Sequence, residues 1–466
     1  MAYRIEEIEV PLDSPFINDD LGRKPVVEFL TGLIGRLEGP FVLAIDSPWG
    51  TGKTTLVKMV AAELQRQDFQ CVQFNAWSVD YVTDPLVALV SSIDRVSLGD
   101  ESAKAAFQES IGKVKKVVGF LAKRTMVAGA KMATLGSLDA EKEIEAAAAE
   151  LTGNLAGDLF DSFEQERELL AKFREDLAGA ISQFSVAGKK ANLIFFVDEL
   201  DRCRPTFAIE LLERIKHLFD VPNLVFVLSI DKKQLEAITA AVYGQGIDAP
   251  EYLRRFIDLE MGIPMANSKQ FTERLVSRFG LDPVFTERGK NRTTYYDKGN
   301  FIDFFTAIAD ALKLTLRARE RCLTRLKVVM DQTPSDHYLD PELVALLIVL
   351  RTNQPEMYRD VVSGRAAPSE TMEFLADRVS RVASLDEQML LVIEAYLIVA
   401  DPDKERQEAK MDELRETLED KELDESTRRK FEDLFNMIRA VRDGTRMHIR
   451  MQNVAAKIDL AAMVRD

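Results

Sequence analysis

The chain has 466 residues, of which 46% are apolar, so it is long enough for two or three globular domains with sizeable cores. Its formal net charge of -16 argues against a protein that coats nucleic acid, because such a protein needs a broad basic surface. The cysteines and histidines are scattered and do not have the spacing of zinc ligands. The sequence shows neither a signal peptide nor an apolar run long enough to span a membrane. We therefore expect a cytoplasmic protein without a transmembrane segment.

The first regular elements are a helix and a buried strand. Turn formers dominate residues 1–24, and a helix then begins at Pro25. The next segment, Phe41 to Asp46, reads FVLAID and is apolar at every position but the last. Such a run is typical of an interior strand in a parallel sheet.

The segment SPWGTGKT at 47–54 follows this strand and is close to the phosphate-binding pattern G-x-x-x-x-G-K-[ST]. Gly50 and Gly52 can adopt backbone angles that turn the N–H groups of the loop inward around a phosphate. Lys53 would reach the β- and γ-phosphates, and the Thr54 hydroxyl would hold Mg²⁺. The segment therefore predicts a binding site for a nucleoside triphosphate.

One position departs from the pattern, because Ser47 stands where the first glycine belongs. A serine fits there only if its backbone angle is unstrained, and an ordinary strand-to-helix turn is the alternative interpretation. We expect the next helix to begin at Thr55 and to add its positive N-terminal end to the site. The loop residues expected to contact the nucleotide are Trp49, Gly50, Thr51, Gly52, Lys53, Thr54 and Thr55.

A long insertion interrupts the next part of the sheet. A strand is expected at Cys71–Phe74 and a helix from about Asp84 to Val96, but the next convincing strand is Asn192–Val197. A strand-helix-strand unit needs only about 30 residues. We therefore predict a helical insertion at about 98–188.

The first part of this insertion is a basic amphipathic helix. An apolar stripe containing Val114, Val117, Val118 and Leu121 is surrounded by basic residues between Lys113 and Lys131. A helix of this kind can lie on an anionic membrane surface or a phosphate backbone. The alternative is a helical hairpin packed on the core, with a solvated basic face.

The segment from Leu193 to Leu200, LIFFVDEL, reads as a buried strand that ends in two carboxylates. Asp198 would hold the hydration shell of Mg²⁺, and Glu199 would orient and deprotonate the attacking water. Acids at a strand end can also cap the next helix. Because they follow a phosphate loop on the same predicted sheet, we favour the catalytic interpretation.

Two further strands complete the predicted sheet. Leu224–Ile230 is followed by a helix at Lys232–Tyr243, and a short strand at Ile257–Ile263 comes next. Ser229 and Asp231 lie at the end of the first of these strands, where polar side chains could sense a γ-phosphate. The alternation predicts a doubly wound, mostly parallel α/β sheet with its phosphate site at the carboxyl ends of the strands.

From Ser268 onward the sequence reads as helical apart from connecting loops. The clearest of these is a polar stretch, 282–300, which we expect to be a loop. We divide the whole chain into a nucleotide-binding core at 1–265, a helical lid at 266–335 and an all-α C-terminal domain at 336–466.

These stretches together resemble the KAP family of P-loop NTPases, within the broad class that includes AAA+ and STAND proteins. The matching stretches are SPWGTGKTTL, FNAWSVDYVTDPL, a long run from IFFVDELDRC through HLFDVPNLVFVLSID, YLRRFIDLEMGIP and LTLRARERCL. They occur in the order of the family and cover roughly residues 20–330. The family often carries membrane-spanning helices within its P-loop domain, whereas the insertion here is too charged to span. That departure suggests a soluble or membrane-peripheral member.

The resemblance implies binding and hydrolysis of ATP with Mg²⁺, coupled to a conformational or assembly switch in a setting such as bacterial antiphage defence. It also implies a homo-oligomer. By analogy with AAA+ proteins, Arg254 or Arg255 could complete the site of a neighbouring copy, and Arg317 in the lid could contact the γ-phosphate. The alternatives are surface arginines that bridge acids such as Glu251 and Asp258, and a solvated helix arginine.

Three other functions remain open. The chain could be an ATP-gated scaffold with little hydrolysis that recruits an effector protein through its insertion and helical tail. A small-molecule kinase is less favoured, because the adjacent pair Asp198 and Glu199 suits water activation. Nucleic-acid binding would be confined to the basic segment Lys113–Lys131.

Overall fold

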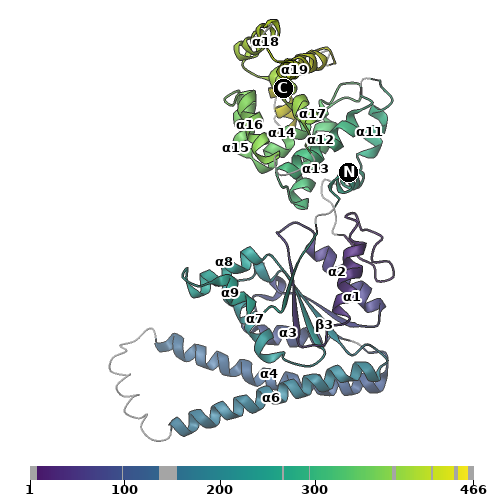
Figure 1. Cartoon of the computed structure of the whole chain (residues 1–466). Helices are drawn as coiled ribbons and strands as arrows, with labels where there is room; N and C mark the ends of the chain where they lie inside the picture. The colour runs from purple at the N-terminus through teal and green to yellow at the C-terminus, as the bar shows by residue number, and fades with distance from the viewer. Residues whose placement is uncertain are drawn as a thin grey trace. The chain divides into compact units, whose positions relative to one another are not determined.

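The computed structural model describes residues 8–96, 98–135, 155–264, 267–292, 294–379, 385–420, 423–444 and 450–459. The chain folds as two compact units, each with its own core (Figure 1). The first unit contains Ile8–Asp19 and Arg23–Pro264, and the second consists mainly of Met265–Asp466.

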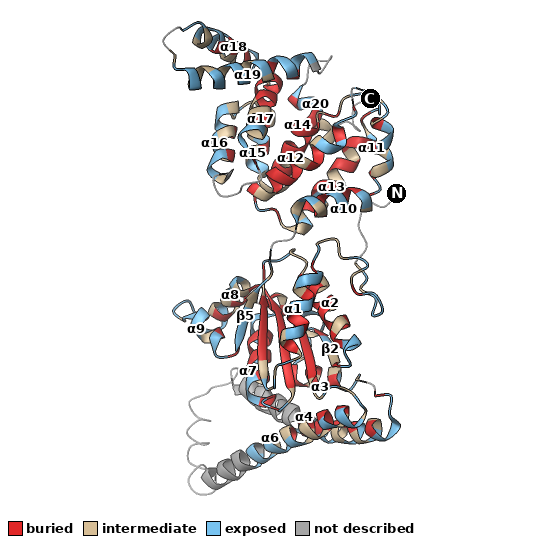
Figure 2. Ribbon diagram, turned by 45° about the vertical axis from the view of Figure 1, so that its right-hand side comes forward, coloured by how far each residue is buried: buried red, intermediate tan, exposed pale blue. Residues whose placement is uncertain are grey.

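The first unit is built on a five-stranded parallel sheet, which confirms the predicted α/β class. The strand order is β2 (Gln70–Asn75), β3 (Leu193–Asp198), β4 (Leu224–Ile230), β1 (Phe41–Asp46) and β5 (Leu259–Gly262). The apolar composition of β1, β3 and β4 suits these three central strands, which are buried along almost their whole length (Figure 2).

Alternate residues of each strand enter different apolar clusters, as the two-residue period of a strand requires. Leu43 and Ile45 face a cluster shared with α1 (Lys24–Ile34) and α2 (Lys53–Arg66). Val42 and Ala44 face the opposite cluster. That second cluster also includes residues of α3 (Pro85–Ile93), α7 (Pro205–Leu218), α8 (Lys232–Tyr243) and α9 (Ala249–Arg254). Helices therefore cover both faces, and only the strand ends remain open to carry polar chemistry.

The predicted insertion contains α4 (Glu101–Leu135) and α6 (Leu155–Val186), which run side by side (Figure 1). Val114, Val117 and Val118 are buried in the same cluster as one face of the sheet. This part of the stripe is therefore covered by protein and is not an apolar face for a membrane. The side chains from Leu121 to Lys131 lie outside the described residues.

The second unit is entirely helical in its described residues. Its helices are α10 (Ser268–Arg278), α11 (Asp282–Arg288), α12 (Asp297–Ala311), α13 (Leu316–Asp331), α14 (Pro341–Asn353), α15 (Pro355–Ser363), α16 (Pro368–Val379), α17 (Glu387–Ala400), α18 (Lys404–Glu419), α19 (Glu425–Gly444) and α20 (Met451–Ile458). One apolar core extends from Phe271 to Ile458. The proposed segments 266–335 and 336–466 thus share one core, and their boundary stays a proposed functional division. Among the helices of the described ranges, none is long and apolar enough to cross a membrane.

The expectation of a polar loop at 282–300 is wrong, because α11 and the start of α12 occupy much of it. Two of the polar residues in this segment form a buried ion pair, in which Arg288 donates to Asp297 at 2.7 Å. Phe285, three residues before Arg288, packs into the core. Sequence polarity indicated solvent here, whereas the two opposite charges satisfy each other inside the protein.

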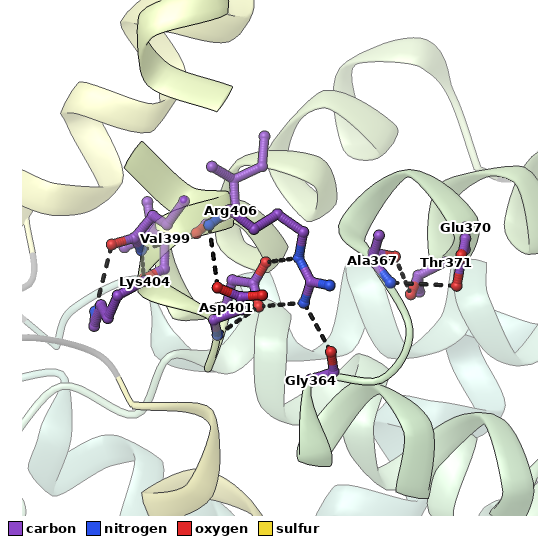
Figure 3. Close-up of polar contacts among 11 residues, drawn as sticks. Gly364, Ala367, Glu370, Thr371, Val399, Asp401, Lys404 and Arg406 are labelled. Carbon is purple, nitrogen blue, oxygen red and sulfur yellow. Dashed lines mark hydrogen bonds and ion pairs between the residues drawn. The ribbon is translucent and has the colours of Figure 1, made fainter. Parts of the chain in front are cut away.

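A second ion pair, between a partly buried arginine and a buried aspartate, ties together three helices of this unit (Figure 3). Asp401, just after α17, accepts hydrogen bonds from Nε and one terminal nitrogen of Arg406 in α18, both at 2.7 Å. The same terminal nitrogen reaches the carbonyl oxygen of Gly364, which ends α15, at 2.9 Å. The bidentate geometry fixes the turn between α17 and α18 against the end of α15.

Candidate functional site

The loop between β1 and α2 has the geometry that its sequence predicts. Gly50 and Gly52 have φ angles of 77° and 81°, in the left-handed region that glycine adopts without steric cost. Ser47 is not at a positive φ, so serine replaces the expected glycine without backbone strain. Its hydroxyl donates to Oγ1 of Thr51 at 2.7 Å, which links the two ends of the loop.

Helix α2 begins at Lys53 rather than at the expected Thr55, directly after the left-handed Gly52. The Lys53 ammonium is buried and donates to the carbonyl oxygen of Ser47. Burial lowers the pKa of Lys53, and the carboxylates of Asp201, Asp231, Asp198 and Asp46 oppose that shift. The Lys53 cation is thus held inside the loop, with a backbone carbonyl as its hydrogen-bond acceptor.

Two acids that follow other strands of the sheet bind Trp49 in the middle of the loop. The backbone N–H of Trp49 donates to Asp231 at 3.2 Å, and its indole Nε1 donates to Asp201. Burial raises the pKa of Asp201, while the hydrogen bond from Trp49 and the charge of Lys53 act in the opposite direction. Asp231 therefore lies at the loop and accepts a backbone N–H of the loop, and its contact with a γ-phosphate stays a prediction.

An arginine supports the outer side of the same loop. Arg23, at the start of α1, donates to the carbonyl oxygens of Thr51 at 2.6 Å and Gly52 at 3.1 Å. A loop that turns its N–H groups inward must turn carbonyl groups outward, and Arg23 satisfies two of them. Burial lowers the pKa of Arg23 to about 10, with Asp19 opposing the shift.

The two predicted acids follow β3 at the same edge of the sheet. Oδ1 of Asp198 accepts the backbone N–H of Glu199 at 2.9 Å. Glu199 has a φ of 60°, a conformation that costs a residue other than glycine about 1–3 kcal/mol and is common at functional sites. Its Oε2 accepts Nδ2 of Asn75 at 2.9 Å, and its Oε1 pairs with Arg202 at 2.5 Å.

The strand register aligns these groups. Asn75 lies opposite Asp198 on the neighbouring strand, and Asp198 lies opposite Ser229 on the next. Ser229 is fully buried, and its hydroxyl has no hydrogen-bond partner among the described residues. Thr54 and Thr55 are half-buried in the first turn of α2. The predicted strand-end groups are therefore gathered at the carboxyl edge of one sheet.

The predicted arginines are not part of this cluster. Arg254 is exposed and pairs with Glu251 at 2.7 Å, as the surface alternative expects. Arg255 is also exposed. Arg317 is exposed on α13, in the other unit of the chain. Contact of these arginines with a nucleotide stays a prediction.

Sequence reasoning assigned no role to four residues that hold the site, namely Arg23, Asn75, Asp201 and Arg202. Asn75 carried a signal, because it is a polar residue at the carboxyl end of a predicted strand. Asp201 and Arg202 lie in the DELDRC stretch that carried the resemblance. Arg23 lay in a segment that we predicted to be irregular, and nothing in that pattern indicated its contact with the loop.

A parallel sheet with helices on both faces, and a glycine-containing loop between β1 and α2, define a P-loop nucleotide-binding protein. The family model described as the KAP family P-loop domain matches residues 23–332. The chain belongs to this family of P-loop NTPases.

None of the curated proteins matches the chain. Among solved structures, the chain is similar to the ORC2 protein of Aeropyrum pernix in its ADPNP-ADP complexes, with 14% sequence identity and a TM-score of 0.35. That match covers 93% of this chain and 97% of the other.

Proposed function

We propose that this site binds Mg-ATP and hydrolyses it to drive a conformational or assembly switch. The observation that carries the proposal is the meeting of two groups at one sheet edge. One is the loop with Lys53 and Thr54, and the other is the acidic pair Asp198 and Glu199. A loop alone supports binding, whereas an acid next to a metal-binding acid also supports activation of water.

The oxygen atoms available in the site fit a magnesium ion. Within the described residues, neither the Thr54 hydroxyl nor Oδ2 of Asp198 makes a hydrogen bond. Hydroxyl and carboxylate oxygens are ligands that Mg²⁺ accepts, and it usually keeps several waters and binds substrate phosphates as well. Thr54 and Asp198 would hold the ion. Its positive charge would reduce the repulsion between the acids of the site and the phosphates.

The reaction assigns a separate task to each protein group. The loop amides, Lys53 and the start of α2 bind the β- and γ-phosphates. Glu199 accepts a proton from water as the water oxygen attacks the γ-phosphorus. The bond from that phosphorus to the bridging oxygen breaks, its electron pair stays with ADP, and inorganic phosphate leaves. Ser229, whose hydroxyl has no hydrogen-bond partner within the described part of the chain, would sense the γ-phosphate.

The wider role rests on the family resemblance. A cytoplasmic or membrane-peripheral switch in bacterial antiphage defence, acting as a homo-oligomer with a protein partner, is the biological setting that it supports. The exposure of Arg254 and Arg255 is compatible with a contribution to the site of a neighbouring copy. Arg317 would act from the lid after a nucleotide binds.

The test is ATP turnover by the purified full chain, compared with Lys53→Ala and Glu199→Gln. We expect Lys53→Ala to lose nucleotide binding and Glu199→Gln to bind ATP without turnover. A matched control is Lys104→Ala, which removes a partly exposed lysine that pairs with Glu101. Equal turnover in the wild type and both site variants would contradict the proposal.

An ATP-gated scaffold is the second candidate, and a specific contact favours it. Glu199 is held by both Asn75 and Arg202, so its carboxylate is engaged in the resting chain. Tight ATP binding with no turnover at any protein concentration would support the scaffold. Release of inorganic phosphate without a phosphorylated product would exclude a kinase.

A further inference from the structure

We propose that Arg202 is a positioning residue that withholds Glu199 from catalysis and keeps the resting chain a slow ATPase. The inference rests on the proposed function, because it concerns the base of that same reaction. It assigns a role to a residue that the motif for nucleotide binding does not require. The latch, as we call it, consists of Arg202 and the Glu199 carboxylate.

The contact is close and partly sheltered. One terminal nitrogen of Arg202 lies 2.5 Å from Oε1 of Glu199, and the two side chains are 25% and 15% exposed. The other oxygen, Oε2, accepts the amide of Asn75 at 2.9 Å. Both oxygens of the proposed base therefore have protein partners, and one partner carries a full positive charge.

Such pairing opposes the task of a general base. A base must point an oxygen at the water that it activates, and it must gain by accepting a proton. A guanidinium held against that oxygen occupies the position that the water needs and fixes the direction of the carboxylate. Glu199 must therefore exchange Arg202 for water before it can accept a proton.

The backbone keeps Arg202 in reach of Glu199. Glu199 directly precedes the short turn η2 (Leu200–Arg202), three residues before Arg202. The N–H of Arg202 donates to the carbonyl of Glu199 at 3.2 Å. The guanidinium also lies over the ring of Trp77, 5.7 Å from its centre. The latch is thus formed by residues close in sequence, and the Trp77 ring supports the guanidinium of Arg202.

A neighbouring arginine offers a matched control. Arg204 lies two residues further on, is more exposed, and interacts with Asp80 and with the carbonyl of Val82. It has the same charge and almost the same position in the chain, but none of its contacts involves Glu199 or Asp198 among the described residues. Loss of charge alone should therefore affect Arg202 and Arg204 variants alike.

The experiment compares Arg202→Gln, Arg202→Lys and Arg204→Gln with the wild type in the full chain. We expect Arg202→Gln to raise kcat about three- to tenfold, the change that follows loss of a partly sheltered ion pair. The Kd for a non-hydrolysable ATP analogue should stay unchanged. Arg202→Lys should give a smaller rise, because lysine keeps the charge without the planar fork. Arg204→Gln should match the wild type.

Each other outcome has a defined meaning. A fall in kcat of Arg202→Gln would make Arg202 a catalytic group and overturn the latch. An unchanged kcat with a lower Tm would show a merely structural contact and overturn it too. If the wild type and every variant fail to hydrolyse ATP, the proposed function fails and the latch with it. If the wild type is inactive while Arg202→Gln is active, both proposals are supported.

Two additional variants link the effect to Glu199. The double variant Glu199→Gln with Arg202→Gln should show no rise over Glu199→Gln alone, because the base that the latch restrains is gone. Trp77→Ala should raise kcat less than Arg202→Gln, because it removes only the support of the guanidinium. A rise that persists without Glu199 would contradict the inference.

Discussion

The two units of the chain bury acidic groups in different ways. In the sheet unit, Asp198, Asp201 and Asp231 surround the cation Lys53 at an edge where strands end. In the helical unit, Asp297 and Glu342 lie inside an apolar core, each with one carboxylate oxygen that lacks a partner in the described structure. The comparison teaches that buried acids alone do not mark a site. The acids at the strand ends mark a candidate site because they lie around the loop of a P-loop domain.

The largest effect on stability is expected when the ion pair inside the helical unit is broken. Arg288 is 1% exposed and donates to Asp297 and to the carbonyl of Pro334. Arg288→Met would leave Asp297 buried without its cation. We expect the free energy of unfolding to fall by about 3–5 kcal/mol in denaturant titrations of the full chain.

A double variant separates the charge from the packing in this test. Arg288→Met with Asp297→Leu removes both charges, so it should recover part of the lost stability. If the double variant is no more stable than Arg288→Met, the uncompensated charge is not the cause. The Kd for an ATP analogue should be unchanged in both, because neither residue belongs to the sheet unit.

The second effect is a dependence of stability on pH that comes from the helical unit. Burial raises the pKa of Asp340 to about 7, with Glu342 and Asp297 adding to the shift and Lys457 opposing it. The folded state therefore binds more protons than the unfolded state between about pH 4 and pH 7. Stability is greatest at the acidic end of that window and is lost as the pH rises through 7.

The variant Asp340→Asn tests this linkage. We expect the wild type to lose about 2 kcal/mol of unfolding free energy between pH 5 and pH 8, and the variant to lose much less. Asp13→Asn is the control, because its parent is an exposed aspartate of the other unit. Parallel pH profiles for the wild type and Asp340→Asn would show that Asp340 does not carry the effect.

A third prediction concerns the support of the phosphate loop in the sheet unit. Arg23→Ala removes the donors to the carbonyl oxygens of Thr51 and Gly52. The loop would then lose part of its fixed geometry, and we expect nucleotide affinity to fall about tenfold. Isothermal titration measures the Kd, and Arg36→Ala, an exchange of a less buried arginine in the same unit, serves as the control. An unchanged Kd for Arg23→Ala would mean that the loop holds its shape alone.

The two units also differ in how much of them the sequence predicts. The chemistry of the sheet unit lies in contiguous stretches, so the loop at 47–54, the pair Asp198 and Glu199, and all five strands follow from pattern. Their roles in catalysis stay predictions. In the helical unit, Arg288 reaches Asp297 across a segment whose polar letters indicated a loop. A long-range or buried pair leaves no periodic signal, because periodicity reports burial of apolar faces only.

The same limit explains what was missed within the site. Asn75 and Asp198 come from strands separated by the whole insertion, and only the register of the sheet places them side by side. Arg23 acts through backbone carbonyls, which the sequence does not display. Residue identity indicated the candidate groups for chemistry, whereas the groups that hold them in place could be found only in the three-dimensional structure.

The smallest effect on stability is expected at Arg254, and it bears on whether the site of the sheet unit is complete. Its side chain is 69% exposed and pairs with Glu251 within one short helix. Such a pair contributes at most about 1 kcal/mol, so Arg254→Ala should leave the Tm almost unchanged.

A second variant, Glu251→Ala, breaks the same pair but keeps the arginine. If Arg254 completes the site of a neighbouring copy, turnover falls only in Arg254→Ala, and only at protein concentrations where chains associate. Equal turnover in both variants at every concentration would leave the surface ion pair as the whole role of Arg254.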